Sequence, residues 1–233
     1  MKRRNQTRHA VRPGAGPAPG AVRIVGGRWR GTRLVVPDRP GLRPTSDRVR
    51  ETLFNWLLPM LPGARVLDAF AGSGALGLEA VSRGAAEAVL IERDPALADH
   101  LRAAVTRLSA ADCVRVVADD TLHWLARPRA QAFDLVFLDP PFAGDAGGGL
   151  WARALAALEP WLADGAWLYI ERPAPDAADA APGHTAGGAG GAAATGPGRG
   201  WRLHREGRTR DVHYALYRRD PEATGNPGVP VPG

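Results

Sequence analysis

A carboxylate, two prolines and an aromatic ring follow an apolar run near the middle of the chain. The run is Phe133 to Leu138, and the tetrapeptide after it is Asp139-Pro140-Pro141-Phe142. The run predicts a buried strand, and open α/β sheets bind ligands at the carboxyl ends of their strands. The prolines stiffen the loop and leave its carbonyls free to accept hydrogen bonds. The tetrapeptide therefore suits a nucleobase stacked on Phe142, with its amine held by Asp139 and the Pro140 carbonyl. The alternative is an ordinary loop stiffened by two prolines.

A glycine-rich turn follows another predicted strand, Val66 to Phe70. It reads Ala71-Gly72-Ser73-Gly74, and a predicted helix begins directly after it. Glycines let a ligand approach the backbone, and a helix N-terminus offers free amides. The spacing lacks the third glycine of a dinucleotide fingerprint, and there is no Walker lysine. The alternative is a glycine turn in an α/β protein of another kind.

Acidic residues stand at the ends of three predicted strands. They are Asp68, Glu92 and the pair Asp119-Asp120. Glu92 lies at the end of the second strand, where an acid can bind both ribose hydroxyls of an adenosine. Asp119 or Asp120 could contact the adenine amine, and the register of the following helix favours Asp120. A site that has acidic side chains and no cation to bind phosphate suits a nucleoside that carries no phosphates. S-adenosylmethionine is therefore the predicted cofactor.

Basic residues are concentrated at the N-terminal end. Residues 1–50 hold thirteen Lys and Arg and two acids, a charge of +11, whereas the remaining 183 residues carry −5. This asymmetry is typical of a surface that faces nucleic acid. Six residues are predicted to contact RNA: Arg28, Trp29, Arg30, Arg33, Arg43 and Arg48. The five arginines among them are expected to form a basic face beside the mouth of the Asp139 pocket. An aromatic ring among guanidinium groups can stack bases, although Trp29 could instead pack onto the domain.

The N-terminal region divides into two predicted segments. Residues 1–21, rich in Pro and Gly, form a disordered basic arm. Residues 22–62 form an RNA-facing extension with a β-hairpin and a helix that Thr45 or Ser46 caps. Five apolar residues recur at helical spacing and form its core face: Val49, Leu53, Trp56, Leu57 and Met60. Arg48, Arg50 and Glu51 are expected on its other faces.

Residues 63–219 alternate between strand and helix. The predicted strands are 66–70, 88–91, 114–118, 133–138 and 167–170, and the helices are 75–83, 95–108, 121–126 and 150–162. This pattern predicts an α/β fold with a doubly wound parallel sheet. Two further strand runs, 201–205 and 212–217, predict a closing antiparallel hairpin. Residues 173–200, of which 22 are Ala, Gly or Pro, are interpreted as a low-complexity insertion, and 220–233 as a loose tail.

Composition excludes several classes of protein. The chain has 233 residues and is 45% hydrophobic, enough for one substantial domain. Its single cysteine, Cys113, allows no internal disulfide, and the six histidines show no ligand spacing, so no metal is expected. No apolar run approaches a membrane span or resembles a signal peptide. A cytoplasmic protein without a membrane partner is predicted.

The segments that carry these motifs resemble a known family. RIVGGRWRGTRLVVP, GLRPTSDRVRETLFNWL, VLDAFAGSGALGLEAVSRGA, LIERD and FDLVFLDPPF are similar to the bacterial 16S ribosomal RNA (guanine(966)-N2)-methyltransferase family. The resemblance is dense from Val22 to Leu162 and extends to the closing hairpin. It implies a class I S-adenosylmethionine-dependent methyltransferase fold, Rossmann-like, with a mostly parallel seven-stranded sheet of order 3-2-1-4-5-7-6.

The resemblance also implies roles for individual residues. Eight residues form the expected cofactor site: Asp68, Phe70, Gly72, Ser73, Gly74, Glu92, Arg93 and Asp120. Among these, Asp68, Gly72 and Gly74 line the methionine end and Glu92 holds the ribose. Asp139, Pro140 and Phe142 are the expected catalytic residues and receive the guanine. The expected partner is 16S ribosomal RNA within a small-subunit assembly particle, and the protein is expected to be a monomer.

Three other functions remain open from the sequence. The chain could modify another base amine in RNA or DNA, although an Asp rather than an Asn at the start of the tetrapeptide disfavours adenine. It could methylate a small molecule, but the +11 segment would then be unexplained. It could be a ribosome-assembly binding protein with vestigial catalysis, against which the intact Asp139 and cofactor glycines argue.

Overall fold

The computed structural model describes residues 20–36, 46–128, 132–141, 149–174 and 196–220. The predictions for residues 1–19 of the basic arm, 221–233 of the tail, Arg43, Phe142 and most of the 173–200 insertion lie outside these residues. The boundaries differ in two places: Gly20 and Ala21, expected in the disordered arm, belong to a strand, and so does Pro173, expected in the insertion. The strands are β1 (Gly20–Arg23), β2 (Arg33–Val36), β3 (Arg65–Asp68), β4 (Glu87–Glu92), β5 (Val114–Ala118), β6 (Phe133–Leu138), β7 (Leu162–Pro173), β8 (Trp201–Arg208) and β9 (Val212–Arg219). The helices are α1 (Asp47–Leu57), α2 (Ala75–Ser82), α3 (Pro95–Arg107), α4 (Thr121–Leu125) and α5 (Gly149–Leu158).

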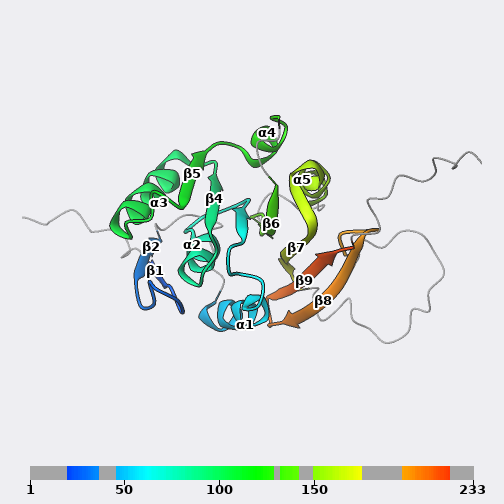
Figure 1. Ribbon diagram of the computed structural model, residues 1–233, viewed down its shortest axis with the longest axis horizontal. Coiled ribbons are helices and arrows are strands. Elements are labelled where there is room, and N and C mark those ends of the chain that lie inside the picture. Colours follow the sequence, from blue (N-terminus) through cyan, green and yellow to red (C-terminus); the bar gives the residue numbers. More distant parts are fainter. Residues whose placement is uncertain (1–19, 37–45, 129–131, 142–148, 175–195, 221–233) are drawn as a thin grey trace, which may run out of the picture.

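Seven strands form one sheet in the order β5-β4-β3-β6-β7-β9-β8 (Figure 1). The strands from β5 to β7 are parallel, and β9 runs antiparallel to both β7 and β8. Counted from β3 as the first strand, this is the order 3-2-1-4-5-7-6 that the family resemblance implies. The chain reverses its winding direction between β3 and β6, and a crevice for ligands forms at such a switch point.

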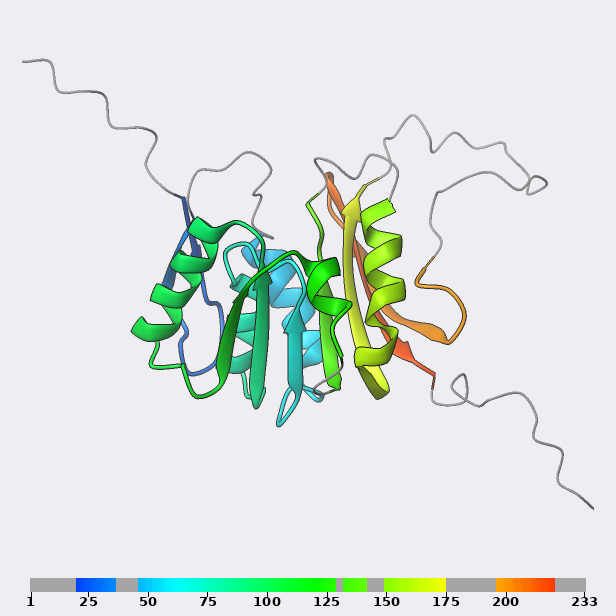
Figure 2. The ribbon, with the colours of Figure 1, turned by 90° about the horizontal axis from the view of Figure 1, so that it is seen from above.

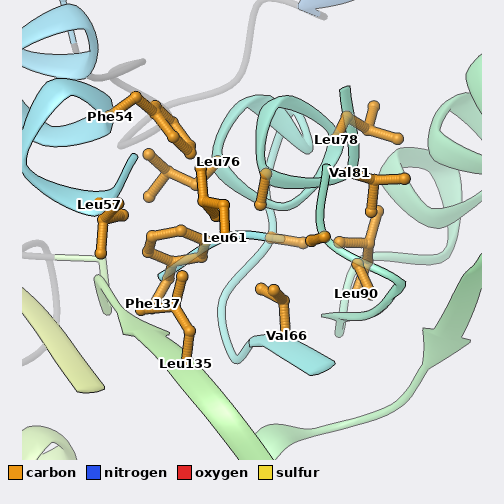
Figure 3. Close-up of a cluster of buried hydrophobic side chains, with 14 of the residues drawn as sticks. Phe54, Leu57, Leu61, Val66, Leu76, Leu78, Val81, Leu90, Leu135 and Phe137 are labelled. Atoms are coloured by element: carbon orange, nitrogen blue, oxygen red, sulfur yellow. The ribbon is translucent and has the colours of Figure 1, made fainter. Parts of the chain in front are cut away.

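Helices cover both faces of the sheet. Helices α1, α2 and α3 bury their apolar sides on one face, and Figure 3 shows this cluster around Phe54, Leu76 and Phe137. Helices α4 and α5 cover the other face, where Trp124 and Trp161 stack with ring centroids 4.4 Å apart. Burial on both faces explains why the parallel strands are continuous apolar runs rather than alternating ones.

Helix starts follow the expected capping chemistry. Ser46 caps α1 by accepting a hydrogen bond from the Val49 amide, as predicted for Thr45 or Ser46. Asp94 caps α3, with Pro95 at the first helical position. These local signals explain why the predicted helix starts agree with the structure.

The segment between α5 and β7 differs from the prediction. The expected helix over 150–162 ends at Leu158, a 3-10 turn covers Glu159–Trp161, and β7 begins at Leu162. Pro160 explains the early end, because a proline disfavours the helical conformation of the residue before it. Strand β7 consequently begins at Leu162 rather than Trp167, and at its other end it extends past Ile170 to Pro173.

The predicted N-terminal hairpin is confirmed, and it is tied to the domain through α2. Strands β1 and β2 pair as a separate antiparallel sheet. The turn between them packs on the end of α2, where the Ser82 hydroxyl donates to the Gly26 carbonyl and accepts from the Trp29 amide. A Cβ on Gly27 would lie 1.9 Å from the Ser82 carbonyl oxygen, so this approach requires glycine.

Arg50 of α1 was expected on a helix face other than the core face, and that expectation is wrong. The residue is fully buried. It donates to the Arg23 carbonyl of β1 at 2.7 Å and forms ion pairs with Asp47 and with buried Glu79 of α2. The guanidinium group therefore joins the hairpin, α1 and α2, a role that helical spacing alone does not indicate.

Candidate active site

The carboxyl ends of four neighbouring strands bring acidic side chains to one edge of the sheet. Asp68 ends β3 and Glu92 ends β4. Asp139 follows β6, and Glu171 lies beside it on β7 because Leu138 pairs with Ile170. The structure therefore brings the predicted acids together. Glu171 was missed, since the sequence pattern placed the end of its strand one residue earlier.

The predicted glycine loop connects β3 to α2. Gly72 and Gly74 have φ angles of 51° and 76°, a region that favours glycine. The Gly72 amide donates to Glu92 Oε2 at 2.9 Å, and the Asp94 amide donates to Glu92 Oε1 at 2.8 Å. Glu92 is therefore fixed against the loop. A carboxylate in this position can also accept from hydroxyl groups of a bound ribose.

Asp68 lies beneath the loop and is almost fully buried. Its Oδ2 accepts a hydrogen bond from the Gly77 amide of α2 at 2.9 Å. Burial raises the pKa of Asp68 to about 7, and the nearby charge of Glu92 adds to this shift against the opposing hydrogen bond from Gly77. Burial therefore disfavours the ionised form of this carboxyl group.

Gly77 is a position that the sequence analysis missed. A Cβ at this residue would lie 2.2 Å from the Leu90 side chain and 3.2 Å from that of Asp68, so only glycine lets α2 approach the strands this closely. A glycine inside a predicted helix was the available signal.

The two acids after β5 have different partners. Asp119 accepts from the His123 ring and from Arg127, and the His123 hydrogen bond lowers the pKa of Asp119. Asp120 is exposed and caps α4 through Oδ1, which accepts from the Leu122 and His123 amides. Because both carboxylate oxygens of Asp119 are used inside the protein, Asp120 is the better candidate for an adenine contact.

The remaining predicted cofactor residues surround the loop in different ways. Phe70 is half-buried and packs against the cluster beneath α4 and α5. Ser73 is half-buried at the tip of the loop, and Arg93 is exposed just after Glu92. Ser73 also borders a hollow of about 240 Å³ between β2 and α3.

Asp139 stands at the other side of the switch point from the glycine loop. It is half-buried, and the following Pro140 is buried. Burial, and then the charges of Glu171 and Asp68, hold the pKa of Asp139 well above its usual range. Buried Tyr169 donates its hydroxyl to Glu171 at 2.6 Å. The edge therefore holds a crowded group of carboxyls next to a stiff acceptor loop, and such perturbed groups gather at functional sites.

Arg28 was expected in a basic face beside Asp139, but it lies away from that loop, and Trp29 lies in the same turn. The Arg28 amide donates to the carbonyl of Ser82, the last residue of α2, and its guanidinium contacts the Cys113 sulfur just before β5. Both partners lie at the amino edge of the sheet, and the blue hairpin runs down the side of the sheet in Figure 2. Trp29 packs on the core, with the Arg28 guanidinium 4.3 Å from its ring centroid. The chain directions of β2 and α2 thus separate this turn from the edge that holds the acids.

The other predicted RNA-contacting residues within the described part of the chain are exposed. Arg30 lies in the same turn, Arg33 begins β2, and Arg48 lies in the first turn of α1. They are therefore available to a partner, but they are distributed along the hairpin and helix rather than gathered at one point.

The strand order, the glycine loop and the acidic strand ends define a class I S-adenosylmethionine-dependent methyltransferase fold. S-adenosylmethionine is the cofactor of this class. The acidic side chains at the strand ends fit it, because it carries hydroxyl and amine groups and no phosphate. The chain belongs to the family described as Conserved hypothetical protein 95, whose model matches residues 22–186. The family resemblance and the fold class predicted from the sequence are both confirmed.

Known proteins agree with this assignment. The chain is 44% identical over 203 residues to "Ribosomal RNA small subunit methyltransferase D" of Escherichia coli, covering 86% of this chain and 91% of the relative. The solved structure of the Escherichia coli protein yhhF superposes with a TM-score of 0.69 at 42% identity, covering 87% of this chain and 99% of that one. An RNA methyltransferase from Salinibacter ruber, solved with S-adenosyl-L-homocysteine, shares the fold at 16% identity and a TM-score of 0.54 over 76% of this chain and 94% of its own.

The described residues contain no group of three or more His, Cys, Asp or Glu side chains arranged to hold a metal ion. None of their helices is long and apolar enough to cross a membrane.

Proposed function

We propose that the chain transfers a methyl group from S-adenosylmethionine to the exocyclic N2 amine of a guanine in 16S ribosomal RNA. The name of the Escherichia coli relative supports small-subunit ribosomal RNA as the substrate class. The observation that carries the reaction is the position of Asp139 and Pro140, at the end of β6 and across the switch point from the glycine loop. An amine of a base bound at Asp139 and Pro140 would therefore lie next to the residues proposed to hold the cofactor.

The residues on the cofactor side suit a nucleoside with a cationic tail. Glu92 would hold the ribose and Asp120 the adenine, while Asp68 and the loop glycines would line the methionine end. When bound, the cofactor supplies an activated methyl group on a positively charged sulfur. Residues 66–74 contain no Lys or Arg, so the loop offers no cation for a phosphate. The raised pKa of Asp68 fits a carboxyl group whose ionised form is completed by a cation of the ligand.

Asp139 and Pro140, which are proposed to bind the guanine, would make its amine more reactive. The lone pair of a guanine amine is delocalised into the ring, so the amine is a weak nucleophile. Asp139 and the Pro140 carbonyl would accept its two N–H groups and direct the lone pair toward the methyl group. As the N–CH3 bond forms and the S–CH3 bond breaks, the amine becomes cationic and Asp139 stabilises that charge. The amine then loses a proton to solvent.

The base must leave its stack to reach this loop. Phe142, outside the described residues, is proposed to replace the lost stacking. The exposed Arg30, Arg33 and Arg48 are proposed to contact phosphates of the RNA, together with Arg28 and Arg43. Trp29, whose ring packs partly on the core, is proposed to contact a base beside them. We further propose that the protein acts as a monomer in the cytoplasm on an assembling small subunit.

The test is an assay of product identity. Purified protein is incubated with radiolabelled S-adenosylmethionine and either free 16S RNA or small-subunit particles from a strain that lacks the gene, and the RNA is digested to nucleosides. We expect N2-methylguanosine as the single labelled product. Label on adenosine would support a different base, and RNA binding without any label would support a binding protein with vestigial catalysis. Either result would overturn the proposed reaction.

A further inference from the structure

A hollow of about 360 Å³ lies between the end of α1 and the β8–β9 hairpin, away from the proposed catalytic edge. Its lining combines rings, apolar side chains and cations: Trp56, Pro59, Met60, Trp167, Arg202, Leu203, His204 and Arg218. None of these residues is acidic. Figure 1 shows α1 beside the β8–β9 hairpin, so two segments far apart in the sequence form this surface.

Flat aromatic surfaces border the hollow. The His204 ring meets Trp167 edge to face, with centroids 4.9 Å apart, and the Arg218 guanidinium lies 5.5 Å from the Trp167 centroid. Trp56 stacks on Tyr214 at 5.6 Å. Leu203 is 46% exposed. Half-buried rings next to an exposed large apolar side chain are typical of an interaction site rather than of a solvated face.

The strand register places like charges together on this surface. Arg202 pairs directly with Arg218 across β8 and β9, and Arg218 pairs with Trp167 on β7, so all three share one face of the sheet. Arg205 pairs with Leu216, which packs in the core on the same face. Like charges directly opposite each other destabilise a sheet. The Trp167 ring gives Arg218 one folding contact, but this contact does not explain why a second guanidinium lies directly opposite, whereas an anionic partner does.

The hollow is close enough to the Asp139–Pro140 loop for one RNA strand to contact both. Trp167 precedes Glu171 by four residues on β7, and Glu171 lies beside Asp139. At about 3.3 Å per residue, the hollow is about 13 Å from the catalytic edge, measured along the strand. An RNA strand that places a base at Asp139 can therefore continue over the β8–β9 hairpin.

We propose that this hollow holds an unpaired stretch of the substrate RNA, with a base against the Trp167 and His204 rings and phosphate between Arg202 and Arg218. This inference rests on the proposed function for the identity of the RNA. Base faces stack on aromatic rings and guanidinium planes, and guanidinium groups bind phosphates in a bidentate manner. An acidic protein segment would satisfy the charges but not the flat rings, so RNA is the occupant that both observations favour.

The charge of the surface is tested with Arg202→Ala/Arg205→Ala, two exposed residues of an edge strand. The matched control is Arg102→Ala/Arg153→Ala, which removes two exposed arginines from α3 and α5. Binding to free 16S RNA is measured as a function of salt. We expect the slope of log Kd against log salt to fall by about 0.7 for each phosphate that the variant no longer binds, with no change in the control. Cofactor affinity and Tm should stay at wild-type values in both variants.

The stacking is tested with His204→Ala. Burial and the charges of Arg205, Arg218 and Arg202 lower the pKa of His204, so its ring is neutral at pH 7 and its removal takes away stacking surface rather than charge. We expect RNA affinity to fall about fivefold, the lower end for one stacked base, while the salt slope stays unchanged.

The outcomes separate this inference from the proposed function. Equal salt slopes for the Arg202/Arg205 variant and its control would overturn the RNA surface while leaving methyl transfer intact. Loss of binding to small-subunit particles but not to free RNA would assign the hollow to a ribosomal protein, and would also overturn it. If wild-type protein fails to methylate 16S RNA but the variant still loses RNA affinity, the proposed reaction fails and the RNA surface stands.

Discussion

Buried charges occur in two parts of this molecule and follow opposite rules. Beneath the N-terminal hairpin, buried Glu79 pairs with Arg83 at 2.7 Å and with Arg50 at 3.5 Å, and it accepts the Val25 amide at 3.2 Å. At the edge where the parallel strands end, four acids gather instead: Asp68, Glu92, Asp139 and Glu171. The charges of Glu171 and Asp68 both raise the pKa of Asp139.

The difference indicates what each region does. Matched charges join elements that are distant in sequence, and removal of one partner leaves the other uncompensated. Crowded like charges cost stability in the free protein and persist where a ligand completes them. We therefore expect variants in the first region to lose stability and variants in the second to lose activity or ligand binding, and the following predictions test this division.

The largest effect is expected for Asp139→Asn, which keeps the shape of the side chain and removes its charge. We expect kcat to fall about 1,000-fold, about 4 kcal/mol, because the charge acts on the cationic transition state. Cofactor affinity should hardly change, and this is measured by calorimetry beside single-turnover rates. Asp134→Asn on the same strand, whose carboxylate pairs with Arg65, is the control. A rate near that of wild type would remove Asp139 from the reaction.

The paired region is tested by Arg50→Ala. We expect the free energy of unfolding to fall by about 3 kcal/mol. This is the lower end of the range for breaking a buried ion pair, because Glu79 still pairs with Arg83 in the variant. The neighbouring exposed Arg48→Ala should change stability by less than about 0.5 kcal/mol. Urea denaturation measures both variants. If Arg50→Ala instead abolished turnover without destabilising the protein, the network would belong to the active site.

The crowded region is tested by the pH dependence of Asp68→Asn. The pKa of Asp68 is raised from 3.8 to about 7 in the folded protein. On raising the pH above about 4, the unfolded chain loses this proton first, so wild-type stability falls until about pH 7 and then levels off. The Asn variant has no such loss. The free energy of unfolding of the Asn variant, relative to wild type, should therefore rise between pH 4 and pH 8 to an excess of about 2–3 kcal/mol. This is less than the energy that corresponds to the whole pKa shift, because Asn accepts the Gly77 hydrogen bond more weakly.

Urea melts at pH 4, 6 and 8 measure this advantage in the cofactor-free protein. The same variant should bind S-adenosylmethionine more weakly than wild type. If the difference in stability between the variant and wild type is constant across this pH range, the pKa of Asp68 is not raised in the folded protein.

The smallest effect is expected for Glu92→Ala. We expect cofactor affinity to fall about tenfold, about 1.4 kcal/mol, through loss of charge-assisted hydrogen bonds to the ribose and of the hydrogen bond from the Gly72 amide. Glu87→Ala, at the other end of β4, is the control for calorimetry. Equal affinities in the two variants would exclude Glu92 from the cofactor site.

Local patterns made much of this fold predictable. The strands from β3 to β6 and their helices agree with the periodicity because both faces of the sheet are covered, which requires apolar runs and amphipathic helices at those positions. The positions of Asp68, Glu92 and Asp139 follow from strand direction alone, since parallel strands end at the same edge. The end of α5 was misjudged because helical periodicity continued past Pro160, whose backbone preference prevailed.

The sequence by itself therefore determined the order of elements, the glycine loop and the edge at which the acids gather. Only the tertiary structure decided how the arginines are used. Arg50 is buried because β1 and α2 meet over α1, and Arg28 faces Cys113 because the hairpin turn packs on the far end of α2. Arg202 and Arg218 oppose each other through strand register. A charge is assigned to core, partner or solvent by long-range packing, and no local pattern encodes that packing.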